Sequence, residues 1–121
     1  MNPSNPGLFQ HKDWISHPVE QLADGIERQM ISGDRLMICR LSFAPRVVTP
    51  VHSHPHEQIT IVERGRVRFT VAGADRIASP GDVLVFPPGL EHGATMLEEA
   101  VVLVDIFSPP REDFLADAAA R

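Results

Sequence analysis

The chain has 121 residues, a formal net charge of −5, and 43% hydrophobic and 22% charged residues. This length is enough for one domain with its own core, and the negative charge excludes the basic surface that nucleic-acid-binding proteins need. The sequence has no stretch of ~20 apolar residues and no basic segment leading into an apolar run near its start. We therefore expect a cytoplasmic protein with neither a membrane nor a nucleic-acid partner.

The first part of the chain is predicted to be an arm. Residues 1–24 contain three prolines that interrupt any long helix, while four apolar residues (Leu8, Phe9, Trp14 and Ile15) offer anchors on the rest of the protein. We expect this N-terminal arm to lie over a single domain formed by residues 25–121.

The remaining chain is predicted to be all-β. Short apolar runs alternate with Gly, Pro, Ser and Asp clusters at intervals of about 8 to 12 residues, which is typical of a sandwich or barrel. In the stretch Arg66–Ala72 apolar and polar residues alternate, so one face is buried and the other is wet. We predict a short C-terminal helix from Glu112 and strands at residues 25–31, 35–43, 51–62, 66–72, 83–86 and 101–107.

The stretch VHSHPHEQ, which begins at residue 51, predicts a metal site. On one strand His52 and His54 point to the same face, about 7 Å apart, so that one divalent ion can bridge them. Gln58 has the same parity, although Pro55 marks a bend before it. A third histidine, His92, follows a turn and a further strand, and barrel metal sites take their ligands from separate strands.

These four residues define the predicted centre. We expect one divalent metal ion, and histidine and amide ligands suit nickel, zinc, iron or manganese. His56 shares the parity of the ligands, but Pro55 leaves its direction open, so we expect it at the rim of the site or behind the ligands rather than on the metal. The single cysteine, Cys39, lies in the apolar run LMICRLSF, so we expect a buried, unreactive thiol.

The spacing of these residues resembles both sequence motifs of the cupin family. The first motif is matched by His52, His54, Gln58 and Gly65, and the second by Gly81, Pro87, Gly89 and His92. The resemblance implies a cupin double-stranded β-helix, that is, a jelly-roll barrel. Two positions depart from the pattern: Arg46 replaces a glycine before the first motif, and Met96 replaces an asparagine after the second.

A third departure bears on the chemistry. Gln58 stands where the family usually has a carboxylate ligand, and three imidazoles and an amide leave the charge of the ion uncompensated. Oxygen-activating iron sites typically use two histidines and a carboxylate. We therefore expect non-redox, Lewis-acid chemistry on a carbonyl, carboxylate or enol oxygen.

Within the cupins, HSHPHEQ followed by VDIFSPPREDFL resembles the KdgF-type proteins of pectin and alginate breakdown, from about residue 25 to residue 115. The resemblance implies an enzyme that converts 4,5-unsaturated monouronates to linear ketonised sugars. It also implies that Asp105, Phe107 and Arg111 line the substrate site. Arg111 would clamp the anionic uronate carboxylate, Asp105 would move a proton, and Phe107 would pack on the sugar ring.

Other interpretations stay open on the sequence alone. Asp105 and Arg111 can form a structural pair at the barrel rim, and Phe107 can be a core residue. The alternative functions are another non-redox cupin enzyme, such as a polyketide-cyclase-like protein or an isomerase, and a non-catalytic sugar- or metal-binding cupin. We also expect a homodimer, since the alternate strand face that carries Ile59 and Ile61 is apolar, although the N-terminal arm can cover this face instead of a partner.

Overall fold

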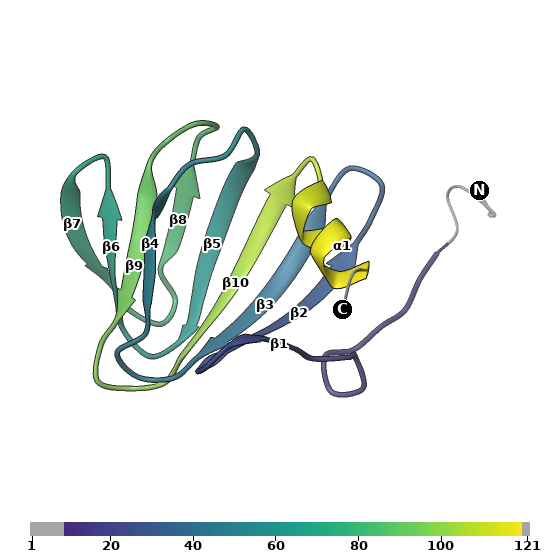
Figure 1. Ribbon diagram of the computed structural model, residues 1–121, viewed down its shortest axis with the longest axis horizontal. Coiled ribbons are helices and arrows are strands. Elements are labelled where there is room, and N and C mark those ends of the chain that lie inside the picture. The colour runs from purple at the N-terminus through teal and green to yellow at the C-terminus, as the bar shows by residue number, and fades with distance from the viewer. Residues whose placement is uncertain (1–8, 120–121) are drawn as a thin grey trace.

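The computed structural model describes residues 9–119, so residues 1–8 of the predicted arm, Leu8 among them, lie outside the described part. Ten strands and one helix follow one another along this part of the chain (Figure 1). The strands are β1 (Glu20–Ala23), β2 (Ile26–Ser32), β3 (Met37–Phe43), β4 (Val48–His52), β5 (Glu57–Arg64), β6 (Val67–Val71), β7 (Ala74–Ala78), β8 (Val83–Phe86), β9 (His92–Met96) and β10 (Val101–Ser108), and the helix is α1 (Glu112–Ala119).

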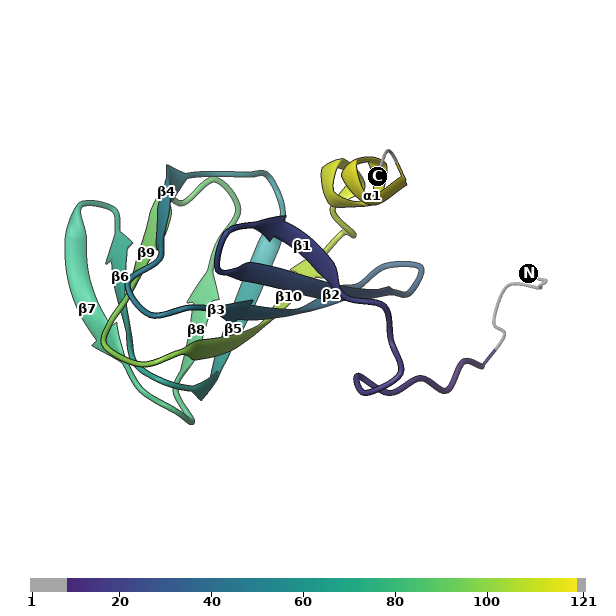
Figure 2. The same ribbon diagram turned by 60° about the horizontal axis from the view of Figure 1, so that its bottom comes forward.

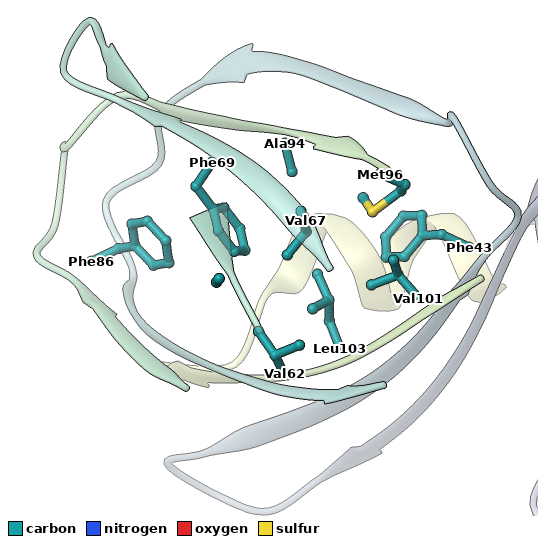
Figure 3. Close-up of a cluster of buried hydrophobic side chains, with 10 residues drawn as sticks. Phe43, Val62, Val67, Phe69, Phe86, Ala94, Met96, Val101 and Leu103 are labelled. Atoms are coloured by element: carbon teal, nitrogen blue, oxygen red, sulfur yellow. The ribbon is translucent and has the colours of Figure 1, made fainter. Parts of the chain in front are cut away.

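The strands form two antiparallel sheets, which confirms the predicted all-β jelly roll. The larger sheet has the order β1-β2-β3-β10-β5-β8, and the smaller sheet has the order β4-β9-β6-β7. The two sheets enclose a core of apolar side chains (Figure 3). Val67 and Phe69 of β6 point into this core while Arg68 between them is exposed, so the predicted alternation is confirmed.

The predicted strand over residues 51–62 is wrong, because the structure divides it into two strands in different sheets. β4 ends at His52, and β5 begins only at Glu57. Between them lies a loop that contains His54 and Pro55. Proline has no backbone N–H for a sheet ladder and disfavours some conformations of the residue before it, which explains the break.

The predicted N-terminal arm includes a strand of the larger sheet. Its end forms β1, which pairs antiparallel with β2 as the edge of the larger sheet. The segment just before it contacts β2, because the Gln29 side chain donates hydrogen bonds to the carbonyls of Trp14 and His17. Phe9 and Ile15 are 90% and 99% exposed, so the prediction that they anchor the arm is wrong. The first described residues run away from the two sheets (Figure 2).

Backbone conformation bears on two positions of the cupin sequence pattern. Gly65 has φ 75°, and a Cβ there would meet the backbone carbonyl of Ala100, so that only glycine fits the turn between β5 and β6. Arg46, at the position where the family pattern has glycine, also has a positive φ of 69°. No helix within residues 9–119 is long and apolar enough to cross a membrane.

Candidate metal centre

Three histidines from separate segments meet inside the barrel. His52 ends β4, His92 begins β9 directly opposite it in the sheet register, and His54 lies in the loop that follows β4. The ring centroids of His52 and His92 are 4.6 Å apart, and those of His54 and His92 are 5.1 Å apart. One ligand nitrogen from each ring lies within 4.8 Å of the other two. The structure thus brings together the three histidines that the sequence singles out.

Backbone carbonyls determine which nitrogen of each ring faces the centre. In each of the three histidines Nδ1 lies against a carbonyl oxygen: His52 against Pro50 at 2.9 Å, His54 against His56 at 3.1 Å, and His92 against Leu90 at 2.8 Å. A carbonyl can only accept a hydrogen bond, so Nδ1 carries the proton and Nε2 keeps its lone pair. This is the arrangement that metal-binding histidines typically show.

The contact between His54 and Gln58 fits a cation. His54 Nε2 lies 2.9 Å from Gln58 Oε1, while His54 Nδ1 already faces the carbonyl of His56. A neutral imidazole has one N–H and can donate to only one of these two oxygens. Two electron-pair donors that converge without a proton between them are what an ion with several ligands requires. The Nε2 atom of His92 is buried and has no hydrogen-bond partner among the described residues, which also indicates a place for a metal ion.

Burial keeps the histidines available for an ion. It lowers the pKa of His54, against the effect of the Gln58 contact, and it also lowers the pKa of His92, to which the charges of His52, His54 and Arg111 add. A lower pKa favours the neutral ring at neutral pH. A metal ion therefore competes with few protons for the two nitrogens.

The amide of Gln58 is held from behind by a chain of two hydrogen bonds. Its Nε2 donates to Thr60 Oγ1 at 2.9 Å, and Thr60 Oγ1 donates to Asp105 Oδ1 at 2.7 Å. Gln58 and Thr60 share the inner face of β5, and Thr60 lies opposite Asp105 of β10 in the sheet register. The Gln58 oxygen is thereby left to face the histidines.

Asp105 faces the cavity as a weak acid. Burial raises its pKa to about 6, although the Thr60 hydrogen bond and the Arg111 charge act in the opposite direction. Its Oδ1 accepts from Thr60, and its Oδ2 makes no hydrogen bond within residues 9–119. A carboxyl group with a pKa near neutrality can both take up and release a proton.

Arg111 does not pair with Asp105, so the structural pair that the sequence left open is not formed. Instead Arg111 Nε and Nη2 donate to the two carboxylate oxygens of Asp113, at 3.0 and 2.8 Å. The guanidinium stacks on Phe114 at 3.9 Å and lies 5.1 Å from the centroid of Phe107. Arg111 is 92% buried, yet it lines the cavity, and the edge formed by its two Nη groups is not used by Asp113.

The cavity has a volume of about 220 Å³, and both apolar and polar side chains line it. Its polar lining includes His52, Gln58, His92, Asp105 and Arg111, so three of the four predicted metal ligands share one space with the predicted substrate residues. Phe107 lies in the wall and contacts both His54 and Phe114, edge to face. Phe107 is only 2% exposed, so it is a core residue as well as part of the cavity wall.

His56 lies outside the cluster of three histidines. Its side chain is buried, and its Nε2 lies 3.7 Å from a carboxylate oxygen of Glu112 at the start of α1. The main contribution of His56 to the centre is its backbone carbonyl, which orients the ring of His54.

The sequence interpretation missed several residues of this site. Thr60 has the same strand parity as Gln58, so the alternation of β5 already contained the signal. Asp113 and Phe114 were missed because nothing in the sequence shows that α1 folds back onto Arg111 and Phe107. Leu22, which also lines the cavity, comes from β1, a strand that the sequence did not predict.

The fold and this centre define a cupin: residues 39–107, more than half of the chain, match the family model described as a cupin domain, and the chain belongs to that family. It is 41% identical over 101 residues to the pectin degradation protein KdgF of Dickeya dadantii (strain 3937), covering 81% of this chain and 91% of the relative.

Two solved structures agree with this assignment. KdgF from Halomonas sp. superposes with a TM-score of 0.84 at 31% identity, covering 88% of this chain and 99% of the other. An RmlC-like cupin from Shewanella frigidimarina NCIMB 400 superposes with a TM-score of 0.82 at 30% identity, covering 88% and 96%.

Proposed function

We propose that this chain is a metal-dependent enzyme that converts 4,5-unsaturated monouronates, from pectin or alginate breakdown, to linear ketonised sugars. The observation that carries the proposal is the similarity to the pectin degradation protein KdgF over most of both chains. The main cavity supports it, because His52, His92, Asp105 and Arg111 line the same space, and His54 completes the cluster of histidines beside it.

In this proposal His52, His54, Gln58 and His92 hold one divalent ion, which can be nickel, zinc, iron or manganese. When bound, the ion supplies Lewis-acid polarisation of the substrate oxygens. The convergence of the ring nitrogens and the amide oxygen supports this set of ligands. Replacing Gln58 by Glu adds a negative charge to the ligand set, and we expect slower turnover with the metal still bound. Unchanged turnover would contradict the Lewis-acid argument.

Arg111 binds the substrate carboxylate in this proposal. The edge of the guanidinium that Asp113 leaves open offers two parallel N–H donors, a geometry that matches a carboxylate. Phe107 forms the apolar wall against the sugar ring. The cavity volume of about 220 Å³ lies below the roughly 300–1,000 Å³ of typical sites for drug-sized ligands. It therefore suits a single sugar ring better than a polyketide or an oligosaccharide.

Asp105 moves the proton. Its Oδ2 accepts the proton of the anomeric hydroxyl while the bond from the anomeric carbon to the ring oxygen breaks, leaving an aldehyde and an enolate. The same carboxyl group then delivers the proton to carbon 4, and a ketone forms at carbon 5. The conversion is an isomerisation, so atoms and electrons balance without a co-substrate. The raised pKa of Asp105, about 6, suits both halves of this transfer.

The decisive assay mixes purified protein, loaded with each of the four metals, with an unsaturated monouronate and follows the absorbance of the conjugated double bond. The expected result is an accelerated loss of absorbance that Asp105→Asn abolishes. No acceleration over the spontaneous reaction with any metal refutes the proposed function and favours the non-catalytic sugar-binding alternative.

The proposal includes a cytoplasmic homodimer. The outer face of the larger sheet is apolar beside its edge strand β8, where Val83 and Val85 are each 59% exposed and lie next to Ile61 and Ile59 of β5. A second copy can cover this face, since exposed apolar patches next to a strand edge favour association. Light scattering tests this. We expect the wild type to be a dimer and Val85→Glu to be a monomer, and a monomeric wild type contradicts the proposed dimer.

A further inference from the structure

Thr60 connects the two halves of the site. It is fully buried on β5, and its hydroxyl is the only group that links Gln58 to Asp105 among the described residues. It accepts a hydrogen bond from the Gln58 amide and donates one to the Asp105 carboxylate. Thr60 lines the cavity but is not one of the proposed metal ligands, and no step of the proposed reaction uses it.

The direction of this chain follows from counting protons. A carboxylate can only accept, and a hydroxyl has a single proton, so the proton of Thr60 goes to Asp105. The Thr60 oxygen must then accept from the –NH₂ group of Gln58. The amide is planar, so its carbonyl oxygen points the other way, to within 2.9 Å of His54 Nε2.

We propose that Thr60 is a positioning residue that fixes which atom of Gln58 faces the metal, and that it couples Asp105 to the metal centre. The inference rests on the metal site of the proposed function. An amide that turns by half a rotation presents –NH₂, which has no lone pair for a cation. No other residue within 9–119 hydrogen-bonds the Gln58 –NH₂ group, so without Thr60 no hydrogen bond from this group opposes that rotation.

The test compares Thr60→Val, which keeps the shape but removes the hydroxyl, with Thr60→Ser, which keeps the hydroxyl. The probes are Zn²⁺ for affinity, by titration against a competing chelator, and Co²⁺ for the visible spectrum of the bound ion. We expect Thr60→Val to bind Zn²⁺ about 10- to 100-fold more weakly, the range found for residues that orient metal ligands, and to shift the Co²⁺ spectrum. Thr60→Ser should restore both.

The chain offers a matched control. Thr70 also donates its hydroxyl to an aspartate, Asp75, at 2.6 Å, but this pair is exposed and does not line the cavity. Thr70→Val should leave the Zn²⁺ affinity and the Co²⁺ spectrum unchanged. In a Gln58→Ala background, Thr60→Val should cause no further loss of affinity, because the ligand that Thr60 orients is gone.

Wild-type affinity and spectrum in folded Thr60→Val overturn the inference, and so does an equal loss of affinity in the Gln58→Ala background. If Thr60→Val does not fold, Thr60→Ser and Thr60→Cys decide: the inference requires Zn²⁺ affinity to follow the strength of the hydrogen bond. These measurements use no substrate. An inactive enzyme that shows the expected metal behaviour therefore refutes the proposed reaction and not the role of Thr60.

Discussion

The buried carboxyl group of Asp105 makes stability depend on pH in a direction that can be tested with Asp105→Asn. Burial raises the pKa of Asp105 from 3.8 to about 6. The folded protein thus holds a proton at pH values where the unfolded chain has lost it, and its stability falls as the pH rises through this window. Each pH unit of the window is worth about 1.4 kcal/mol, so ionisation costs the folded protein about 3 kcal/mol.

Asparagine has nearly the same shape and can still accept from Thr60, but it cannot ionise. The free energy of unfolding of Asp105→Asn minus that of the wild type should therefore rise by about 3 kcal/mol between about pH 3 and about pH 8. For a domain of this size, such a change in unfolding free energy shifts the melting temperature by roughly 10 °C. Any constant cost of the substitution cancels in this comparison of two pH values, and so do contributions from the histidines that both proteins share.

Urea unfolding of metal-free protein, in the presence of a chelator, at a series of pH values measures this difference. Saturating Zn²⁺ should reduce it, since a nearby cation favours the ionised carboxylate and lowers its pKa. Parallel stability curves for the two proteins, or a difference that shrinks with rising pH, would refute the reasoning. The same variant should be inactive, so that the group needed for proton transfer is one that lowers stability at neutral pH.

Three further predictions concern binding and folding. Arg111→Ala should raise the KM for the unsaturated monouronate about tenfold or more, since hydrogen bonds to charged groups are worth about 1.5–3 kcal/mol, while Zn²⁺ affinity stays the same. Gly65→Ala should lower the free energy of unfolding by about 3 kcal/mol or more, because a positive φ and a contact with the Ala100 carbonyl both oppose a side chain. Zn²⁺ at about 100 times its dissociation constant should stabilise the protein by about 2.7 kcal/mol against urea.

Each of these predictions has a control. Arg68→Ala removes an exposed arginine on the outer face of β6 and should leave KM unchanged, whereas equal effects of the two arginines would contradict the binding role. Gly73 also has a positive φ, of 82°, but a Cβ there meets nothing within 4 Å. Gly73→Ala should therefore cost about 1 kcal/mol, and an equal loss for both glycines would show that the Ala100 contact is unimportant. Zn²⁺ that leaves the urea midpoint unchanged would argue against any zinc site in the folded state.

The strands that the sequence predicts well are those with a clear alternation or a strongly apolar run, such as β6, β8 and β10. The missed strands are short or polar. Four of the five residues of β7 are exposed, so it has no buried face to produce an alternating pattern. β9 contains His92 and Gly93 and few residues that favour strands.

The sequence by itself determined the types of residue at the centre and their order along the chain, because each motif is a local pattern of histidines, glutamine and turn residues. Only the tertiary structure decided how these residues are oriented. The nitrogen of each histidine that faces the centre depends on backbone carbonyls, and the oxygen of Gln58 depends on Thr60 and Asp105. Arg111 is held by the helix that follows it. Hydrogen bonds between β5 and β10 join residues 45 positions apart, and no local pattern contains such a contact.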